Sequence, residues 1–595
     1  MIVHGVIRLS AIFLFIISPI DAGPIDTSRN DNGEWQLNII HTNDMHSRFE
    51  QTTQLSAPHC SASLEEMNQC YGGFPRIATL VKRAKSSSTP TLFLNAGDTY
   101  SGSKWFDNYK WEVVAHFLKL LSLDAMSLGN HEFDEKPEGL IPFVKSVPFP
   151  VLACNLDLTG EPELAQSGLK SKTVFDVDGH KVGVIGYVTT ETKSKKTRKV
   201  EFLDEIESIK RQVDELKQEG INIIIAVGHS GYARDLEIAE AVEGLDLLIG
   251  GHTNTFLYHG TEPDVEKKNG SYPTVVKQKR NDGKIKKVYV VQAGAYTKYL
   301  GNVSIIFDRD GEITHIEGNP ILVDSSVPQD PEVLKELDNY GRPYFNNTEA
   351  GVTNVFLDGR DFVCRKSECN LGNLITDAMV EHHKLQYTGS DGWTDAAIAV
   401  LAAGTIRSSI ETPIGHKIVQ GEIDLVLSFE SHVTKVDVTG AELIKALENS
   451  VYRIVNNDIG DLKGHFLQVS GIKVEFDLSK EPGHKVVEDK LFVRCAKCDD
   501  AHYEKIDENK IYGVLVDSWL AGGGDEYTMF KKDSKLVHAA MLNSTVFEYV
   551  KRNSPVNHQV ESRITFVPPP NDDDFSFEFI SEILEDVISY FPLDF

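Results

Sequence analysis

Five times in the first half of this chain, a short apolar run ends and metal-binding residue types follow. The runs are Leu37–Ile40, Thr91–Leu94, Ala125–Leu128, Ile221–Val227 and Leu245–Ile249. The side chains that follow them include Asp44, His46, Asp98, Asn130, His229 and His252. Short apolar runs that alternate with longer helical stretches predict an α/β fold over residues 35–327. Ligands of α/β sheets gather beyond the carboxyl ends of the strands, so we expect these side chains to meet at one site.

The residue types at these strand ends favour a pair of divalent ions. Carboxylate, amide and imidazole groups suit zinc or manganese. One carboxylate can bridge two ions about 3.5–4 Å apart, as in two-metal phosphoesterases. We expect two ions, with zinc preferred and magnesium, manganese or calcium as alternatives. A single Asp-x-His pair is usually surface or capping chemistry, and it is the repetition at separate strand ends that predicts ligation.

The charge of the chain limits its partners. It has 60 Lys and Arg against 88 Asp and Glu, for a net charge of −28. Such an excess argues against nucleic acid or an anionic membrane as the main partner. Anionic small molecules remain compatible, because a local metal pair can override the global field.

A charged helical stretch predicts a linker helix over 328–347, followed by a second mixed domain over 348–566 and an acidic tail over 567–595.

The N-terminus predicts export. Arg8 precedes the apolar run Leu9–Ile20, so residues 1–22 are typical of a signal peptide, with a buried first helix as the alternative. The run is shorter than the ~20 residues that span a bilayer. The C-terminus lacks a continuous apolar anchor signal. We therefore expect a secreted, extracellular protein without a membrane anchor.

The cysteines fit an oxidising compartment. Nearby pairs are Cys60 with Cys70, Cys364 with Cys369, and Cys495 with Cys498, and Cys154 is left over as a thiol. Half of a zinc site is the alternative reading of Cys495-Ala-Lys-Cys498. Glycosylation sequons occur at Asn269, Asn302, Asn346 and Asn543.

The motifs together resemble a known family. They are His41-Thr-Asn-Asp-Met-His46, Ala96-Gly-Asp98, Gly129-Asn-His-Glu-Phe-Asp134, Gly228-His-Ser230 and Gly250-Gly-His-Thr-Asn254. They resemble the 5'-nucleotidase family, which includes ecto-5'-nucleotidases and the salivary apyrases of blood-feeding arthropods. The resemblance covers about residues 35–566. It implies a calcineurin-like metallophosphatase domain with four α/β/β/α layers, followed by a mixed α/β C-terminal domain that carries the nucleotide and rotates.

The resemblance also implies roles for individual residues. Asp44, His46 and His252 would hold one ion, Asn130 and His229 the other, and Asp98 would bridge them. His131 and Asp134 would form a catalytic dyad beside the phosphoryl group. The implied substrate-binding residues are Asn254, Arg365, Arg407, Phe429, Trp519 and Asp525. The chain departs from the family at Ala402 and Thr405, where an amide and a glycine are usual, so an amide contact to the base would be lost at Ala402.

Three functions follow as hypotheses. The first is an apyrase that converts ATP and ADP to AMP and so inhibits platelet aggregation. The second is a 5'-nucleotidase that converts AMP to adenosine. The third is a secreted binding protein whose acidic tail contacts a host haemostasis protein, with packing of the tail on the chain's own body as its alternative.

Overall fold

A computed structural model describes residues 34–567 except for short internal gaps. These gaps are residues 58, 61, 195, 280–282, 342–345, 412–414, 416, 455–463, 499–501 and 532–539. The predicted signal peptide, and the predicted acidic tail beyond Val567, lie outside the described residues. Within the described residues, no helix is both long and apolar enough to cross a membrane.

The first domain contains two sheets, and each supplies some of the predicted strand ends. The first sheet has the order β14-β13-β1-β2-β3-β4, with β15 also paired to β13. Strands β1, β2, β3 and β4 run parallel to one another, whereas β13 is antiparallel to β1. The bounds are β1 Trp35–Thr42, β2 Thr91–Asn95, β3 Ala125–Ser127, β4 Val151–Leu152, β13 Tyr299–Phe307, β14 Ile313–Gly318 and β15 Ile321–Leu322.

The second sheet has the order β11-β12-β10-β9-β7-β6. Its inner strands β7, β9, β10 and β12 are parallel, and β6 and β11 close the edges antiparallel. The bounds are β6 Lys172–Val177, β7 His180–Val188, β9 Ile223–His229, β10 Leu247–Ile249, β11 Thr274–Lys279 and β12 Ile285–Val291. All five apolar runs of the sequence are therefore strands, three in the first sheet and two in the second.

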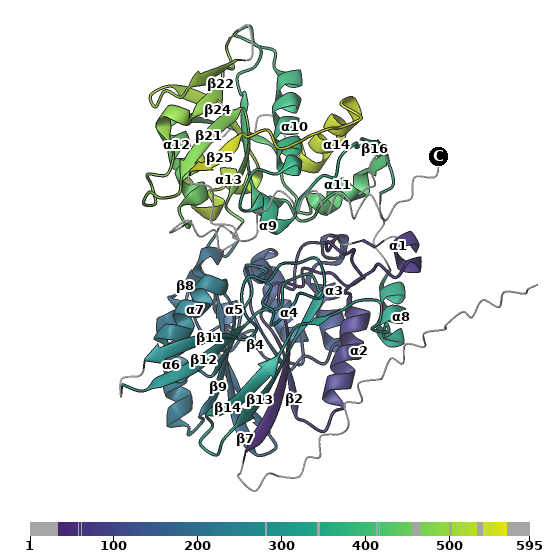
Figure 1. The fold of residues 1–595 in the computed structure, drawn as a ribbon, viewed down its shortest axis with the longest axis vertical. Helices are drawn as coiled ribbons and strands as arrows, with labels where there is room; N and C mark the ends of the chain where they lie inside the picture. The colour runs from purple at the N-terminus through teal and green to yellow at the C-terminus, as the bar shows by residue number, and fades with distance from the viewer. Residues whose placement is uncertain are drawn as a thin grey trace, which may run out of the picture.

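Apolar side chains on both faces of the two sheets create the layers (Figure 1). Ile39 and Leu94 of one sheet and Ile225 of the other belong to one core between the sheets. Separate cores lie under the helices, since strands buried on both faces are apolar throughout. The covering helices are α2 Phe74–Lys85, α3 Lys104–Leu120 and α4 Lys136–Ser146 on the first sheet, and α6 Glu205–Gln218 and α7 Tyr232–Ala241 on the second. The predicted α/β/β/α arrangement is confirmed.

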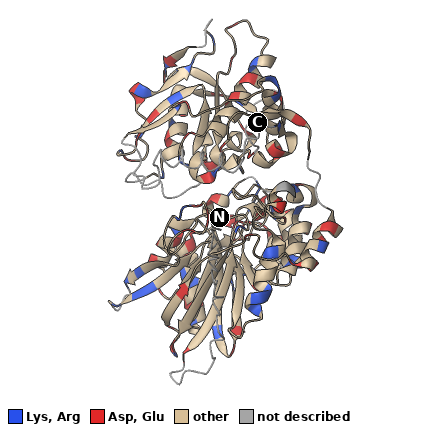
Figure 2. Ribbon diagram, turned by 45° about the vertical axis from the view of Figure 1, so that its right-hand side comes forward, with Lys and Arg blue, Asp and Glu red and all other residues tan. Residues whose placement is uncertain are grey.

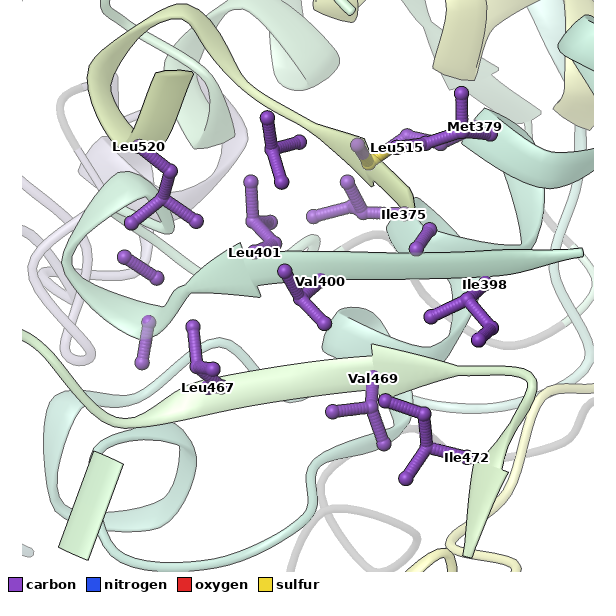
Figure 3. Packing of buried hydrophobic residues seen from close by; sticks show 14 of the residues in the cluster. Ile375, Met379, Ile398, Val400, Leu401, Leu467, Val469, Ile472, Leu515 and Leu520 are labelled. Carbon is purple, nitrogen blue, oxygen red and sulfur yellow. The ribbon is translucent and has the colours of Figure 1, made fainter. Parts of the chain in front are cut away.

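The second domain is mixed α/β, also as predicted. Its sheets have the orders β19-β24-β17-β20 and β23-β22-β21-β25, with β16 and β18 as a further pair. Val400 and Leu401 of β17 pack with Ile375 and Met379 of α10 in its core (Figure 3). The strands are β16 Glu349–Val352, β17 Ile398–Ala402, β18 Lys417–Val419, β19 Thr434–Thr439, β20 Leu467–Ser470, β21 Ile472–Asp477, β22 Phe492–Arg494, β23 Tyr503–Lys505, β24 Ile511–Val516 and β25 Ile564–Val567. The longer helices are α10 Asn370–Gln386, α11 Gln420–Val426, α12 Gly440–Val451 and α14 Leu542–Arg552.

Short elements and bridges complete the fold. Helix α8 (Pro331–Tyr340) starts at the cap Asp330 and buries Val333 and Leu337 in the first domain's core. The three cysteine pairs are disulfides, and Cys154 is a buried thiol. The remaining short elements are α1 Ala62–Glu66, α5 Pro162–Ala165, α9 Asp361–Cys364, α13 Ser518–Ala521, β5 Leu156–Asp157 and β8 Glu201–Phe202.

A partly buried carboxyl between the domains makes stability depend on pH. Glu411 of the second domain accepts a hydrogen bond from Thr53 of the first (3.0 Å). Burial raises the pKa of Glu411 to about 7. Because an unfolded Glu titrates near 4.3, the ionised form penalises the folded state above pH 7, and this penalty disappears below about pH 4.3.

We therefore expect Glu411→Gln to raise the free energy of unfolding by about 1–3 kcal/mol at pH 8 and by almost nothing near pH 4.5. Differential scanning calorimetry at both values measures the change. The matched control is Glu430→Gln, at an exposed side chain, which should have little effect at either pH. Equal melting temperatures for Glu411→Gln and the parent at pH 8 would refute the burial argument.

Candidate active site

The five strand ends meet at one site, although they come from two sheets. The loop after β1 carries Asp44 and His46, and the loop after β2 carries Asp98. Asn130 follows β3. From the second sheet, His229 is the last residue of β9, and His252 follows β10. The site therefore spans the carboxyl edges of both sheets.

Two sets of ligand atoms share one carboxylate. Asp44, His46 and Asp98 form one set, and Asp98, His229 and His252 form the other, each with its ligand atoms within 4.8 Å of one another. Asp98 Oδ2 lies 3.7 Å from His46 Nε2 and 2.9 Å from His229 Nε2. Asp98 is thus placed to bridge two ions. The family resemblance implied that His252 shares an ion with Asp44 and His46, whereas the structure groups it with Asp98 and His229.

The donor set fits divalent cations. Ser101 O lies 3.2 Å from His46 Nδ1 and Ala96 O lies 2.7 Å from His229 Nδ1, and these contacts orient both rings. The buried Oδ1 of Asn130 has no hydrogen-bond partner among the described residues. Burial and the charge of Asp98 raise the pKa of Asp44 to about 6 against the opposing effect of His229. A cation would satisfy the amide oxygen and offset the repulsion between the carboxylates.

The backbone is strained at four proposed ligands and at Asn254, a proposed substrate-binding residue. The residues Asp44, His46, Asp98, His252 and Asn254 have φ angles of 49°, 46°, 53°, 79° and 54°. This left-handed region is costly for side chains other than glycine, and such strain clusters at functional sites. Glycine also gives room for close approach, because a Cβ on Gly129 would lie 2.2 Å from Asp98 Oδ1.

A carboxylate that the sequence analysis did not single out holds the loops together. Glu132 is fully buried and accepts hydrogen bonds from the backbone N–H groups of Asp98 (3.0 Å), Thr99 (2.7 Å) and Gly129 (2.6 Å). It thereby fixes the loop after β2 to the loop after β3. Its place inside the Gly-Asn-His-Glu-Phe-Asp motif was the available signal.

The proposed dyad is formed. His131 Nδ1 lies 2.7 Å from Asp134 Oδ2, and the backbone N–H of His131 donates to Asp98 Oδ1 (2.9 Å). Lys196 Nζ lies 2.8 Å from the other Asp134 oxygen, and Ser101 Oγ donates to the first. Burial alone would lower the pKa of His131, but the charges of Asp134 and Asp98 outweigh it and raise that pKa. The imidazole is therefore oriented and made more basic beside the metal centre.

The second domain places two predicted residues directly against this site. Arg407 Nη2 lies 2.9 Å from His46 Nε2. The ring of Phe429 stacks on that of His131, with centroids 5.5 Å apart and planes 9° apart, and the Arg407 guanidinium lies over the same ring. His131 and His46 of the first domain are thus in direct contact with Phe429 and Arg407 of the second.

The other predicted substrate residues lie around this contact. Asn254 donates to Asp361 Oδ2 (2.6 Å), whose other oxygen is 3.1 Å from Arg365. Trp519 is 39% exposed and donates to Asp525 Oδ2 (3.0 Å). Among the described residues, no ring contact joins Phe429 to Trp519.

A buried arginine that the sequence analysis missed adjoins the site. Arg48 is 1% exposed and donates to His46 O and to Gly102 O. Its guanidinium lies 4.7 Å from the ring centre of Tyr296, which in turn contacts His46. Arg48 therefore supports the loop of a proposed metal ligand. Its position two residues after His46 gave no separate signal.

Comparisons with known proteins agree with this geometry. Residues 37–256 match the calcineurin-like phosphoesterase family and residues 349–532 match the 5'-nucleotidase C-terminal domain. Protein 5NUC of Lutzomyia longipalpis is 42% identical over 546 residues, covering 90% of this chain and 93% of that protein. Human 5'-nucleotidase is 41% identical over 547 residues, covering 90% and 91%.

A solved structure gives the same result. The 5'-nucleotidase precursor from Thermus thermophilus has a TM-score of 0.79 and 33% identity, over 90% of this chain and all (100%) of that one. Both domains and their order are accounted for by one family. The chain therefore belongs to the 5'-nucleotidase family and is a metal-dependent phosphoester hydrolase with nucleotide substrates.

Proposed function

We propose that this protein removes the phosphate of nucleoside 5'-monophosphates, with AMP as the reference substrate. The observation that carries the proposal is the contact of Phe429 and Arg407 with the His131 side of the metal centre. A base-binding surface this close to the ligands suits a nucleotide with one phosphate. The names of the human and bovine relatives point the same way.

The chain's own residues suggest how the reaction proceeds. Asp44, His46, Asp98, Asn130, His229 and His252 would hold two divalent ions, which would polarise the phosphoryl oxygens and lower the pKa of a water. Arg407 would add a fork of N–H donors to the phosphate. His131, fixed by Asp134, would stabilise charge or hold a proton on the leaving ribose oxygen. The closed contact between the domains would exclude bulk water.

Apyrase activity is the second candidate, favoured by one observation. Ala402, at the end of β17, is 1% exposed and offers no amide to a base. Thr405, 7% exposed, lies 3.4 Å from Asp517 Oδ2 through its hydroxyl. A base held less specifically would leave recognition to the phosphate chain, as suits ATP and ADP. Export from the cell and inhibition of platelet aggregation belong to this second proposal.

A substrate panel tests both proposals. Phosphate release from AMP, ADP and ATP is measured on purified protein, with and without a chelator. We expect AMP to give the highest kcat/KM and the chelator to abolish release. Hydrolysis of ADP and ATP with none of AMP would reject the first proposal in favour of apyrase.

Removing the guanidinium of Arg407 should reduce the stabilisation of the transition state. We expect Arg407→Ala to lower kcat/KM for AMP by roughly 10²-fold, since charge-assisted bidentate contacts are the strong ones. Arg494→Ala is the matched control. Arg494, the last residue of β22, lies over the ring of Trp393 and has no part in the site. Steady-state kinetics of the pair would contradict the proposed role if both variants kept the parental kcat/KM.

A further inference from the structure

A carboxylate of the second domain lies on two of the proposed substrate-binding residues. Asp361, the first residue of α9, accepts a hydrogen bond from Asn254 Nδ2 through its Oδ2 (2.6 Å). Its Oδ1 lies 3.1 Å from Arg365 Nη2. Figure 2 shows the two domains one above the other, and the bond to Asn254 crosses the boundary between them. One acidic side chain thus engages substrate-binding groups of both domains.

The surroundings of this carboxylate are cationic. Arg48, Arg365 and Arg407 are all buried, with 1%, 7% and 7% of each residue exposed. Burial lowers the pKa of Arg48 to about 10, the charge of Arg407 adds to this lowering, and the charge of Asp361 opposes it. Burial would lower the pKa of Arg407 too, but Tyr296 and anionic groups that include Asp361 raise it. Asp361 therefore supplies negative charge to a cluster of three buried arginines.

Some donors of this arginine cluster are left for another anion. Arg48 Nε, Arg48 Nη2 and Arg407 Nε are buried and have no hydrogen-bond partner among the residues that the structure describes. Buried donors without a partner are costly, so their presence indicates that an anion binds them at some stage. Arg407 also contacts His46, a proposed metal ligand, at 2.9 Å. A phosphate bound beside Arg407 would lie in the same cluster as Asp361.

Local helix stability does not explain both contacts of Asp361. An acidic residue in the first turn of a helix, paired with an arginine four residues on, is a common stabilising feature. That account covers the contact with Arg365. It does not cover the shorter bond to Asn254, which belongs to the other domain. It also gives no reason for a carboxylate to lie among arginines that are expected to bind phosphate.

We propose that Asp361 is an internal anion that occupies part of the phosphate-binding cluster in the free enzyme and is displaced by the substrate. The inference rests on the proposed function, with Asn254, Arg365 and Arg407 as groups that bind the nucleotide phosphate. A carboxylate and a phosphate compete for the same N–H donors, and two anions in one buried site repel each other. Asp361 therefore weakens the binding of the substrate and of the phosphate product. It raises KM and leaves the chemical step unchanged.

Phosphate binding without turnover tests this role. Inorganic phosphate is titrated by calorimetry into the desalted, metal-loaded full chain, as the parent and as the variants Asp361→Asn and Asp361→Ser. We expect both variants to bind phosphate roughly tenfold more tightly than the parent does, because the competing charge is gone. KM for AMP should fall by a similar factor, whereas kcat should change by less than about twofold.

The matched control is Asp437→Asn, which removes an exposed carboxylate of the same domain that lies 3.2 Å from Lys435 Nζ. It should bind phosphate as the parent does. If Asp361 only ordered the loop or joined the domains, its removal would weaken phosphate binding and raise KM. Weaker, unchanged or undetectable phosphate binding by either variant, at an unchanged circular dichroism spectrum, would overturn the inference. Tighter phosphate binding by both variants, with no hydrolysis of AMP by the parent, would instead reject the proposed function and keep the role of Asp361.

Discussion

Replacing Asp98 by Asn should reduce phosphate release by roughly 10³-fold or more. Asp98 is the carboxylate common to both sets of ligand atoms, with Oδ2 at 3.7 Å from His46 Nε2 and 2.9 Å from His229 Nε2. An amide has the same shape but no charge, so it cannot bridge two cations. Initial rates of phosphate release from AMP, with metal analysis of the same sample, measure the effect.

A control separates this loss from misfolding. Asp124→Asn changes another carboxylate of the first domain, which lies away from the site. Its Oδ2 is 2.8 Å from Lys85 Nζ. We expect it to keep near-parental activity. Asp98→Asn should give an unchanged circular dichroism spectrum. A parental rate from well-folded Asp98→Asn would refute the bridging role.

Replacing His131 by Ala should lower kcat by about 10²–10⁴-fold, the usual contribution of a positioned acid or base. The imidazole is oriented by Asp134 at 2.7 Å, and the backbone N–H of His131 donates to Asp98, which places the residue beside the proposed metal ligands. If the ring acts on the leaving oxygen, a good leaving group should need it less. We therefore expect a much smaller loss with p-nitrophenyl phosphate than with AMP.

The control for this variant is His116→Ala. His116 lies 3.0 Å from Glu336 on the outside of the first domain and does not contact the site. Its kinetics with both substrates should match the parent. Equal losses of kcat for AMP and p-nitrophenyl phosphate in His131→Ala would contradict a role on the leaving group, and no loss would remove His131 from the mechanism.

Much of the fold could be predicted from the sequence because local patterns encode it. The apolar runs before Asp44, Asp98, Asn130, His229 and His252 are strands, because buried parallel strands read as continuous apolar segments. The residues that follow each strand lie at the carboxyl edge of its sheet, and this shared position brings them together. The cysteine pairs were equally local, since each joins residues at most 10 apart.

The grouping of the ligands could not be predicted, because it depends on how the two sheets face each other. His252 comes from the second sheet beside His229, so it lies with that residue and Asp98. The supports of the site were also hidden. Glu132 and Arg48 act through backbone groups brought close by tertiary packing. The motif around Glu132 marks its position but not this role, and the sequence around Arg48 gives no separate signal.

The central claim is that six side chains from five strand ends gather around a pair of divalent ions. Metal analysis of fully active, desalted protein by plasma mass spectrometry tests this claim most directly. We expect close to two divalent ions per chain, with activity and metal lost together on chelation and regained together on adding zinc or manganese. Full activity in protein that contains no divalent ion would contradict it.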